Sequence, residues 1–103
     1  MTQYCVTTTD DLPHGTLMRV EAGGVTMCLA RAGDGAIYAI DDACSHEQAS
    51  LSEGELVDAT WVECPMHSSL FDLKTGAVYG LPARLPVRSF PVSVEGRSVF
   101  VDV

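Results

Sequence analysis

The sequence predicts an all-β protein, and three features of the chain support that prediction. Short apolar runs recur at close spacing, turn-forming Gly, Pro and Asp residues separate them, and no stretch carries a sustained helical stripe. The runs expected as strands are Leu17–Ala22, Val25–Ala30, Ala36–Ile40, Trp61–Glu63, Leu70–Leu73, Val87–Val94 and Ser98–Val103. With 103 residues, the chain is expected to form a single domain spanning residues 1–103.

Glycine-containing segments between these runs are expected to be hairpin turns, because Gly tolerates the positive φ angles that tight turns need. They are Gly23-Gly24, Gly33-Asp34-Gly35 and Glu95-Gly96-Arg97. The last hairpin alternates most clearly between apolar and polar residues. Its apolar face is expected to hold Phe90, Val92 and Val94 on the first strand and Val99, Val101 and Val103 on the second.

The stretch from Asp41 to Pro86 differs from the rest of the chain. It is richer in Ser, Glu, His, Gly and Pro, with only short apolar pieces between them. We expect a loop-rich insertion that is carried by the strands on either side. Loops on a rigid sheet scaffold are where functional residues tend to concentrate, so this insertion is where a functional site is expected.

The charge balance excludes several classes of function. The chain has 14 acidic residues against 6 basic ones, a formal net charge of −8, which argues against binding to nucleic acid or to anionic membrane surfaces. No uncharged run exceeds nine residues, whereas a membrane-spanning helix needs about 20. The N-terminus has no basic, apolar leader, so we expect a cytoplasmic protein with reduced thiols.

Two short motifs in the insertion carry metal-binding chemistry. Cys44-Ser45-His46 is followed, after 17 residues, by Cys64-Pro65-Met66-His67. Two thiolates and two imidazoles suit zinc or iron–sulfur rather than magnesium or calcium. The set could close a tetrahedral zinc site, although zinc modules usually pair Cys with Cys and His with His. Alternatively, the two cysteines hold one iron and the two histidines another.

The pattern Cys44-x-His46 and Cys64-x-x-His67 resembles the Rieske 2Fe–2S signature, in which two His replace two Cys on one iron. Residues 44–54, 63–72 and 75–76 and the proline-containing tail from residue 82 to residue 92 resemble the soluble Rieske-type ferredoxins of bacterial multicomponent, ring-hydroxylating oxygenases. The resemblance in motif covers about residues 36–103. It implies a Rieske fold: an antiparallel β-sandwich base with a loop-rich cluster-binding subdomain at about residues 41–86.

The resemblance also implies a function. Such proteins are not enzymes; they carry one electron from an NAD(P)H-dependent flavin reductase to a terminal Rieske-type oxygenase by means of one 2Fe–2S cluster. By position, Cys44 and Cys64 would hold the inner iron, and His46 and His67 the outer, partly exposed iron. A monomer is expected, with no nucleic-acid or membrane partner. The alternative is a non-redox binding or regulatory subunit with a structural metal site.

Four residues near the motif bear on how the cluster would be held. The Rieske proteins of respiratory and photosynthetic complexes carry an extra disulfide beside the cluster, whereas Ala49 and Met66 stand near the corresponding positions here. Phe71 stands where those proteins place a Tyr that hydrogen-bonds a sulfur, while Ser69 matches their sulfide-bonding Ser. With one such hydrogen bond missing, a potential at the low end of the Rieske range is expected.

The remaining thiols and the third histidine have simpler interpretations. Cys5 and Cys28 lie in apolar, strand-like contexts and are expected to be buried free thiols. His14, between Pro13 and Gly15, is expected to be a solvated turn residue.

Seven acidic residues lie between Asp41 and Glu63, and they are expected to form a solvated surface. Some are expected to surround the exposed His46 and to steer a basic patch on a redox partner, with Glu47 the first candidate.

Overall fold

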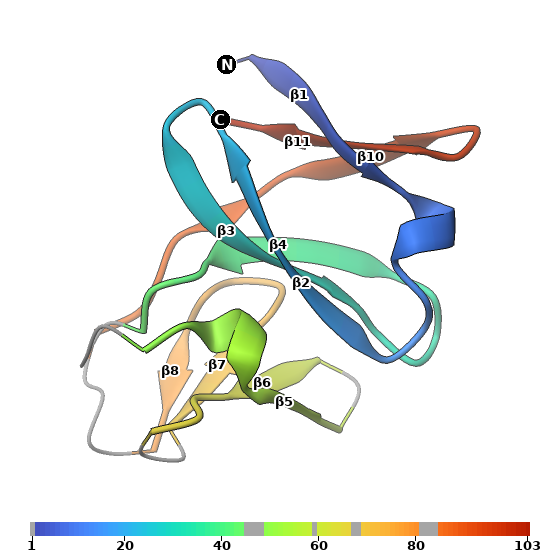
Figure 1. Cartoon of the computed structure of the whole chain (residues 1–103). Coiled ribbons are helices and arrows are strands. Elements are labelled where there is room, and N and C mark those ends of the chain that lie inside the picture. Colours follow the sequence, from blue (N-terminus) through green and yellow to red (C-terminus); the bar gives the residue numbers. More distant parts are fainter. Residues whose placement is uncertain (1, 45–48, 59, 67–68, 81–84) are drawn as a thin grey trace.

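The structure of the protein, a computed structural model, describes residues 2–44, 49–58, 60–66, 69–80 and 85–103. It consists of three antiparallel sheets arranged one above another, with β1, β10 and β11 at the top of Figure 1 and β5 to β8 at the bottom. The strands are β1 (Gln3–Thr8), β2 (Thr16–Ala22), β3 (Val25–Arg31), β4 (Ile37–Asp41), β5 (Glu55–Val57), β6 (Trp61–Glu63), β7 (Leu70–Asp72), β8 (Val78–Tyr79), β9 (Ser89–Phe90), β10 (Val92–Glu95) and β11 (Ser98–Asp102). The all-β prediction is confirmed.

The strand order defines a base and a smaller unit. The base consists of the three-stranded sheet β1-β11-β10 and the four-stranded sheet β2-β3-β4-β9. The small sheet, β5-β6-β7-β8, is built from residues 55–79, within the stretch where the sequence predicts a loop-rich insertion. Two short 3₁₀ helices, Thr9–Asp11 and Leu51–Glu53, complete the described elements. No helix in the described part of the chain is long and apolar enough to cross a membrane.

The sheet β2-β3-β4-β9 is the middle layer and is buried on both faces. Successive residues of a strand point to opposite faces, so Met27 and Leu29 of β3 enter one core while Cys28 and Ala30 enter the other. This double burial explains the uninterrupted apolar run in β3. The core of the base contains Leu12, Val20, Ala22, Met27, Leu29, Ala39, Val99 and Val101. The second core lies between the middle layer and the small sheet, and it holds the candidate site.

The turn predictions agree with the structure. Gly23 and Gly24 join β2 to β3 with φ angles of 56° and 79°, as a tight two-residue turn requires. Gly96 has a φ of 61° in the turn between β10 and β11, where Glu95 pairs with Ser98. These glycines fix the register of the two hairpins.

Several expectations differ from the structure at the strands. The expected run Val87–Val94 is two strands, β9 and β10, because Pro91 lies between them and has no backbone N–H to donate. Val94 is 45% exposed, because it lies near the hairpin tip, beyond the core. Strands β1, β5 and β8 were not expected.

Cys5 is exposed, and the expectation that it is buried is wrong. It belongs to β1, which lies at the edge of its sheet among the described strands, pairs with β11 and has an irregularity between Cys5 and Thr7. Cys28 is buried and His14 is exposed, as expected.

Candidate metal centre

Cys44 and Cys64, 20 residues apart in sequence, come together in one core. Both side chains are buried, with exposed fractions of 5% and 1%. Cys44 follows β4 of the base and Cys64 follows β6 of the small sheet, so the site lies where these two units meet. The buried members of this core are Cys28, Ala30, Ile40, Cys44, Leu51, Val62, Cys64, Phe71, Leu73 and Val87.

Each of these two cysteines begins a loop that is closed by the same kind of hydrogen bond. The Cys44 N–H donates to the Ala49 carbonyl at 2.9 Å, and the Cys64 N–H donates to the Ser69 carbonyl at 2.8 Å. In both cases four residues lie between the donor and the acceptor. Two matched loops therefore start from buried thiols, and in sequence each loop contains one histidine of the motif.

His46 and His67 lie outside the described residues, as do Glu47 and Ser68. Within the part of the chain that the structure describes, no three metal-ligating side chains lie close enough to hold one ion. The buried donors of the motif among the described residues are the thiols of Cys44 and Cys64. Soft thiolate ligands in an apolar core fit an iron–sulfur cluster.

The residues around the two thiols bear out some of the expected environment. None of the four cysteines of the chain forms a disulfide. Met66 is 59% exposed, and Ala49 accepts the loop-closing hydrogen bond. Phe71 and Ser69 are completely buried, Phe71 as a member of the core that contains Cys44 and Cys64. A hydroxyl at position 71 would therefore lie in that core.

An ion pair ties together the two segments that flank the small sheet. The Arg88 guanidinium donates from Nη2 to Asp41 Oδ1 at 2.9 Å and from Nε to both carboxylate oxygens at 3.2 and 3.1 Å. The backbones pair as well, since the Asp41 N–H donates to the Arg88 carbonyl at 3.0 Å. Hydrogen bonding and the negative charge of Asp41 raise the pKa of Arg88. We call this pair the neck clasp.

Asp42 is buried rather than solvated, and its exposed fraction is 4%. Its Oδ1 accepts the Ser52 N–H at 2.9 Å, and its Oδ2 accepts the Ser50 hydroxyl. The expectation of a wholly solvated acidic surface is therefore wrong for Asp42 and for Asp41, which is paired with Arg88. It holds for Glu53, Glu55 and Asp58, which are exposed.

Sequence reasoning missed the structural roles of Asp41 and Asp42. The available signal was their position three and two residues before Cys44. Their partners, however, lie 47 residues away for Asp41 and 8 and 10 residues away for Asp42, so the sequence alone could not reveal them.

A surface cleft with a volume of about 400 Å³ lies beside the neck clasp, and both Asp41 and Arg88 line it. Its charged lining groups already pair with one another: Asp41 with Arg88, and Asp42 with Arg19 at 3.8 Å. The charge of Asp41 is compensated by the close contact with Arg88, whereas the more distant Arg19 offsets the charge of Asp42 only in part.

Burial in the second core disfavours a negative charge on the Cys28 thiol. Burial, and secondarily the charge of Asp42, raises the pKa of the Cys28 thiol from 9.0 to about 12. Cys28 therefore stays a neutral thiol at physiological pH and acts as a packing residue.

Comparison with known proteins gives one family and a set of ferredoxins. The family model described as the Rieske [2Fe-2S] domain matches residues 2–91. The chain is 46% identical over 93 residues to the 3-phenylpropionate/cinnamic acid dioxygenase ferredoxin subunit of Escherichia coli (strain K12). The match covers 90% of this chain and 86% of that relative.

Solved structures agree with this result. The ferredoxin of carbazole 1,9a-dioxygenase from Nocardioides aromaticivorans IC177 superposes with a TM-score of 0.91 and 37% identity, covering 98% of this chain and 97% of that chain. A chain in a structure described as the complex of reduced oxygenase and oxidized ferredoxin in carbazole 1,9a-dioxygenase gives a TM-score of 0.87 and 37% identity, covering 96% and 91%.

Proposed function

Because the chain belongs to the Rieske [2Fe-2S] domain family, we propose that its cluster is held by the four residues of the sequence motif: Cys44, His46, Cys64 and His67. The observation that carries this proposal is the burial of Cys44 and Cys64 in one core, each at the start of a loop closed by the same hydrogen bond. Under this assignment the two cysteines share one iron and the two histidines share the other.

The protein is a Rieske ferredoxin, an electron carrier rather than a catalytic enzyme. The bound cluster supplies a site that takes up and releases one electron. The chain's own residues supply an apolar core around the two buried thiols. The named relatives that are 37–46% identical to this chain are ferredoxins of dioxygenases, which favours the electron carrier over the alternative of a non-redox regulatory subunit.

The partners follow from the named relatives. Those relatives are ferredoxin subunits of dioxygenases, and one is described in complex with its oxygenase. We propose that this ferredoxin delivers electrons to a terminal Rieske-type oxygenase acting on aromatic compounds, and that it receives them from an NAD(P)H-dependent flavin reductase. We further propose a cytoplasmic monomer of one domain, residues 1–103, with its cluster-binding subdomain at about residues 41–86.

The test measures two electron transfers, one from the reductase to this protein and one from this protein to the oxygenase. With NADH and the flavin reductase, the oxidised protein is expected to be reduced by one electron per chain under anaerobic conditions, as followed by its visible absorption. The reduced protein, mixed with oxidised oxygenase, is expected to be reoxidised as the oxygenase is reduced. Cys44→Ser is the inactive comparison and Cys5→Ser the matched control. A colourless, zinc-containing wild-type protein that exchanges no electrons would contradict the proposal.

A further inference from the structure

Among the described residues, Asp42 is the one charged side chain that is buried. It lies two residues before Cys44, where the chain leaves β4 and enters the first loop of the site. A buried carboxylate needs hydrogen-bond donors, because burial removes the water that would otherwise solvate it. Its surroundings therefore show what holds it there.

Among the described residues, the hydrogen-bond partners of the Asp42 carboxylate are all donors. The Ser52 N–H donates to Oδ1 at 2.9 Å, and the Ser50 hydroxyl donates to Oδ2. The backbone adds further ties: the Leu51 N–H donates to the Asp42 carbonyl at 2.7 Å, and the Asp42 N–H donates to the Thr26 carbonyl at 3.1 Å. The carboxylate thus anchors residues 50–52 to the strand end that leads into Cys44.

The same bonds lie next to those that close the Cys44 loop. Ala43 forms a bridge with Ser50, and the Cys44 N–H donates to the Ala49 carbonyl at 2.9 Å. Residues 49–52 therefore meet residues 42–44 along their whole length, with the Asp42 side chain at one end. Both the position and the charge of the Asp42 side chain therefore influence the backbone geometry at Cys44.

The negative charge of Asp42 is only partly compensated. Arg19 Nε lies 3.8 Å from Oδ2, beyond hydrogen-bond distance, and the Arg19 side chain is 62% exposed. Water therefore screens most of the arginine's charge, while the carboxylate stays buried. The charge also reaches into the second core, since Asp42 contributes to the raised pKa of the Cys28 thiol. Cys28 belongs to the same core as Cys44 and Cys64.

We propose that Asp42 is a positioning residue that holds the Cys44 loop and whose negative charge lowers the reduction potential of the cluster. The inference rests on the proposed function, because it requires a cluster at Cys44. Reduction adds one electron, and hence one negative charge, to the cluster. A fixed anion nearby opposes that addition, and Arg19 offsets part of the effect.

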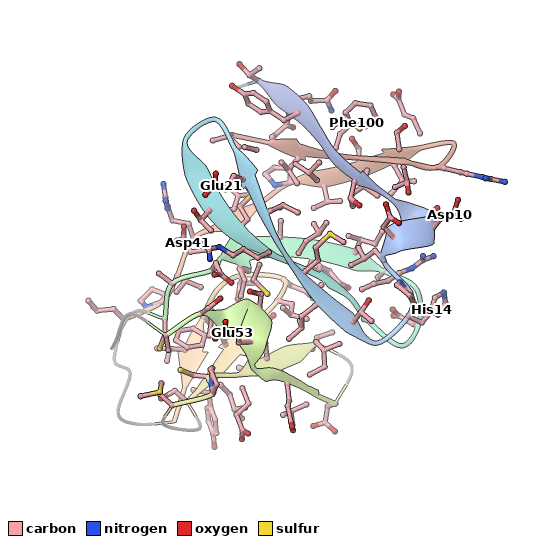
Figure 2. All side chains as sticks on the ribbon, viewed as in Figure 1. Asp10, His14, Glu21, Asp41, Glu53 and Phe100 are labelled. Atoms are coloured by element: carbon pink, nitrogen blue, oxygen red, sulfur yellow. The ribbon has the colours of Figure 1, made fainter. Side chains whose placement is uncertain are left out.

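The experiment is an anaerobic spectroelectrochemical titration, with redox mediators, of the cluster-loaded wild type and three single variants. Asp42→Asn removes the charge but keeps an oxygen to accept the Ser52 N–H and an amide to donate to the Ser50 hydroxyl. Arg19→Gln removes the offsetting positive charge. Asp10→Asn is the matched control, because it also breaks an Asp–Arg pair, with Arg97 at 3.2 Å. Figure 2 shows Asp10 on the opposite side of the molecule from Asp41, the neighbour of Asp42.

At the wild-type midpoint potential, the reduced-to-oxidised ratio of Asp42→Asn is expected to rise about threefold, which is about 28 mV at 59 mV per decade for one electron. Arg19→Gln is expected to shift the ratio in the opposite direction, and Asp10→Asn to leave it unchanged. Iron content and thermal unfolding are measured on the same samples, and Asp42→Asn is expected to retain its cluster.

Two results would overturn the inference while leaving the proposed function intact. One is an unchanged potential in cluster-loaded Asp42→Asn; the other is an equal shift in Asp10→Asn, which would make net charge the cause. If Asp42→Asn does not load a cluster, Arg19→Gln decides: a lower potential supports the charge effect, and an unchanged one overturns it. A wild type without iron and sulfide would overturn the proposed function itself.

Discussion

Asp41 and Arg88 form a bidentate ion pair, with Nη2 to Oδ1 at 2.9 Å, between the segment that precedes the small sheet and the one that follows it. The Arg88 backbone N–H also donates to Asp41 Oδ2 at 2.7 Å. The carboxylate therefore serves both the side chain and the main chain of Arg88. Asp41 lies at the left of Figure 2, between the base and the small sheet.

The two partners of the neck clasp are not equivalent, so their substitutions are expected to differ. Arg88→Ala is expected to cost at most about 1 kcal/mol, since the Arg88 side chain is 66% exposed. Asp41→Ala is expected to cost about 2 kcal/mol, because it also leaves the Arg88 N–H without its acceptor. Urea unfolding measures both, with Arg97→Ala as the control for an exposed pair. Equal losses would show that the main-chain bond contributes little.

Gly76 and Gly80 provide a matched pair for testing the backbone of the small sheet. Both have positive φ angles, 79° and 89°, but a Cβ at Gly76 would lie 1.9 Å from the Val87 carbonyl oxygen, whereas a Cβ at Gly80 meets nothing within 4 Å. Gly80→Ala is expected to cost about 1 kcal/mol, from backbone strain alone. Gly76→Ala is expected to cost about 3 kcal/mol, because the Val87 N–H to Gly76 carbonyl bond must also shift.

Thermal unfolding distinguishes the two substitutions, since 1 kcal/mol shifts the melting temperature of a domain of this size by about 4–8 °C. Gly76→Ala is also expected to lose its cluster faster on dilution, because Val87 packs in the core that contains Cys44 and Cys64. If both glycine variants melt at the same temperature, the close approach at Gly76 does not constrain the fold.

Alkaline pH is expected to destabilise the protein through Cys28. Burial, and secondarily Asp42, raises the pKa of this thiol from 9.0 to about 12, so above pH 9 the unfolded chain releases a proton that the folded chain retains. The free energy of unfolding is therefore unaffected by this thiol below about pH 9, and it falls as the pH rises toward 12. About 2 kcal/mol of an eventual 4 kcal/mol is expected to be lost by about pH 10.5, at 1.36 kcal/mol per pH unit.

Urea unfolding at about pH 8 and about pH 10.5 measures this loss. In Cys28→Ala the alkaline loss is expected to shrink by that amount, whereas Cys5→Ser, which changes an exposed thiol, is expected to leave it unchanged. An alkaline loss of the same size in Cys28→Ala would assign it to other groups.

The redox potential tests the interpretation of Phe71 and Ser69. With no hydroxyl at position 71, the wild-type midpoint is expected at the low end of the range of about −150 to +300 mV for Rieske centres. Ser69→Ala is expected to lower it further, because a hydrogen bond to sulfur stabilises the reduced, more negative cluster. Phe71→Tyr is expected to raise it, provided that the hydroxyl reaches a sulfur. A wild-type midpoint in the upper half of the range would contradict this interpretation.

The parts of the fold that the sequence predicts are those with local causes. Gly23-Gly24 and Gly96 reveal their hairpins because tight turns need positive φ angles, and the apolar run of β3 reveals a buried strand. Strand β1 is different: three of the six residues of Gln3–Thr8 are exposed and none is buried, and the segment becomes a strand by pairing with β11, near the opposite end of the sequence. The exposure of Cys5 follows from that same edge position.

The candidate site divides in the same way. The sequence reveals its thiols and imidazoles because, within each loop of the motif, the Cys and the His are two or three positions apart. The structure places Cys44 and Cys64 buried in one core. The burial of Asp42 depends on Thr26, Ser50 and Ser52, and the neck clasp on a residue 47 positions away. Only the folded chain brings these groups together, so the supporting contacts had to come from the structure.

The most direct test of the central claim is the iron and acid-labile sulfide content of the purified wild type and seven single variants. The wild type, Cys5→Ser, Cys28→Ala and His14→Ala are expected to contain about two irons and two sulfides per chain. Cys44→Ala, Cys64→Ala, His46→Ala and His67→Ala are expected to lose the cluster. Full iron and sulfide in any of these last four variants, or a wild type that carries zinc instead, would contradict the assignment of the cluster to the two motif loops.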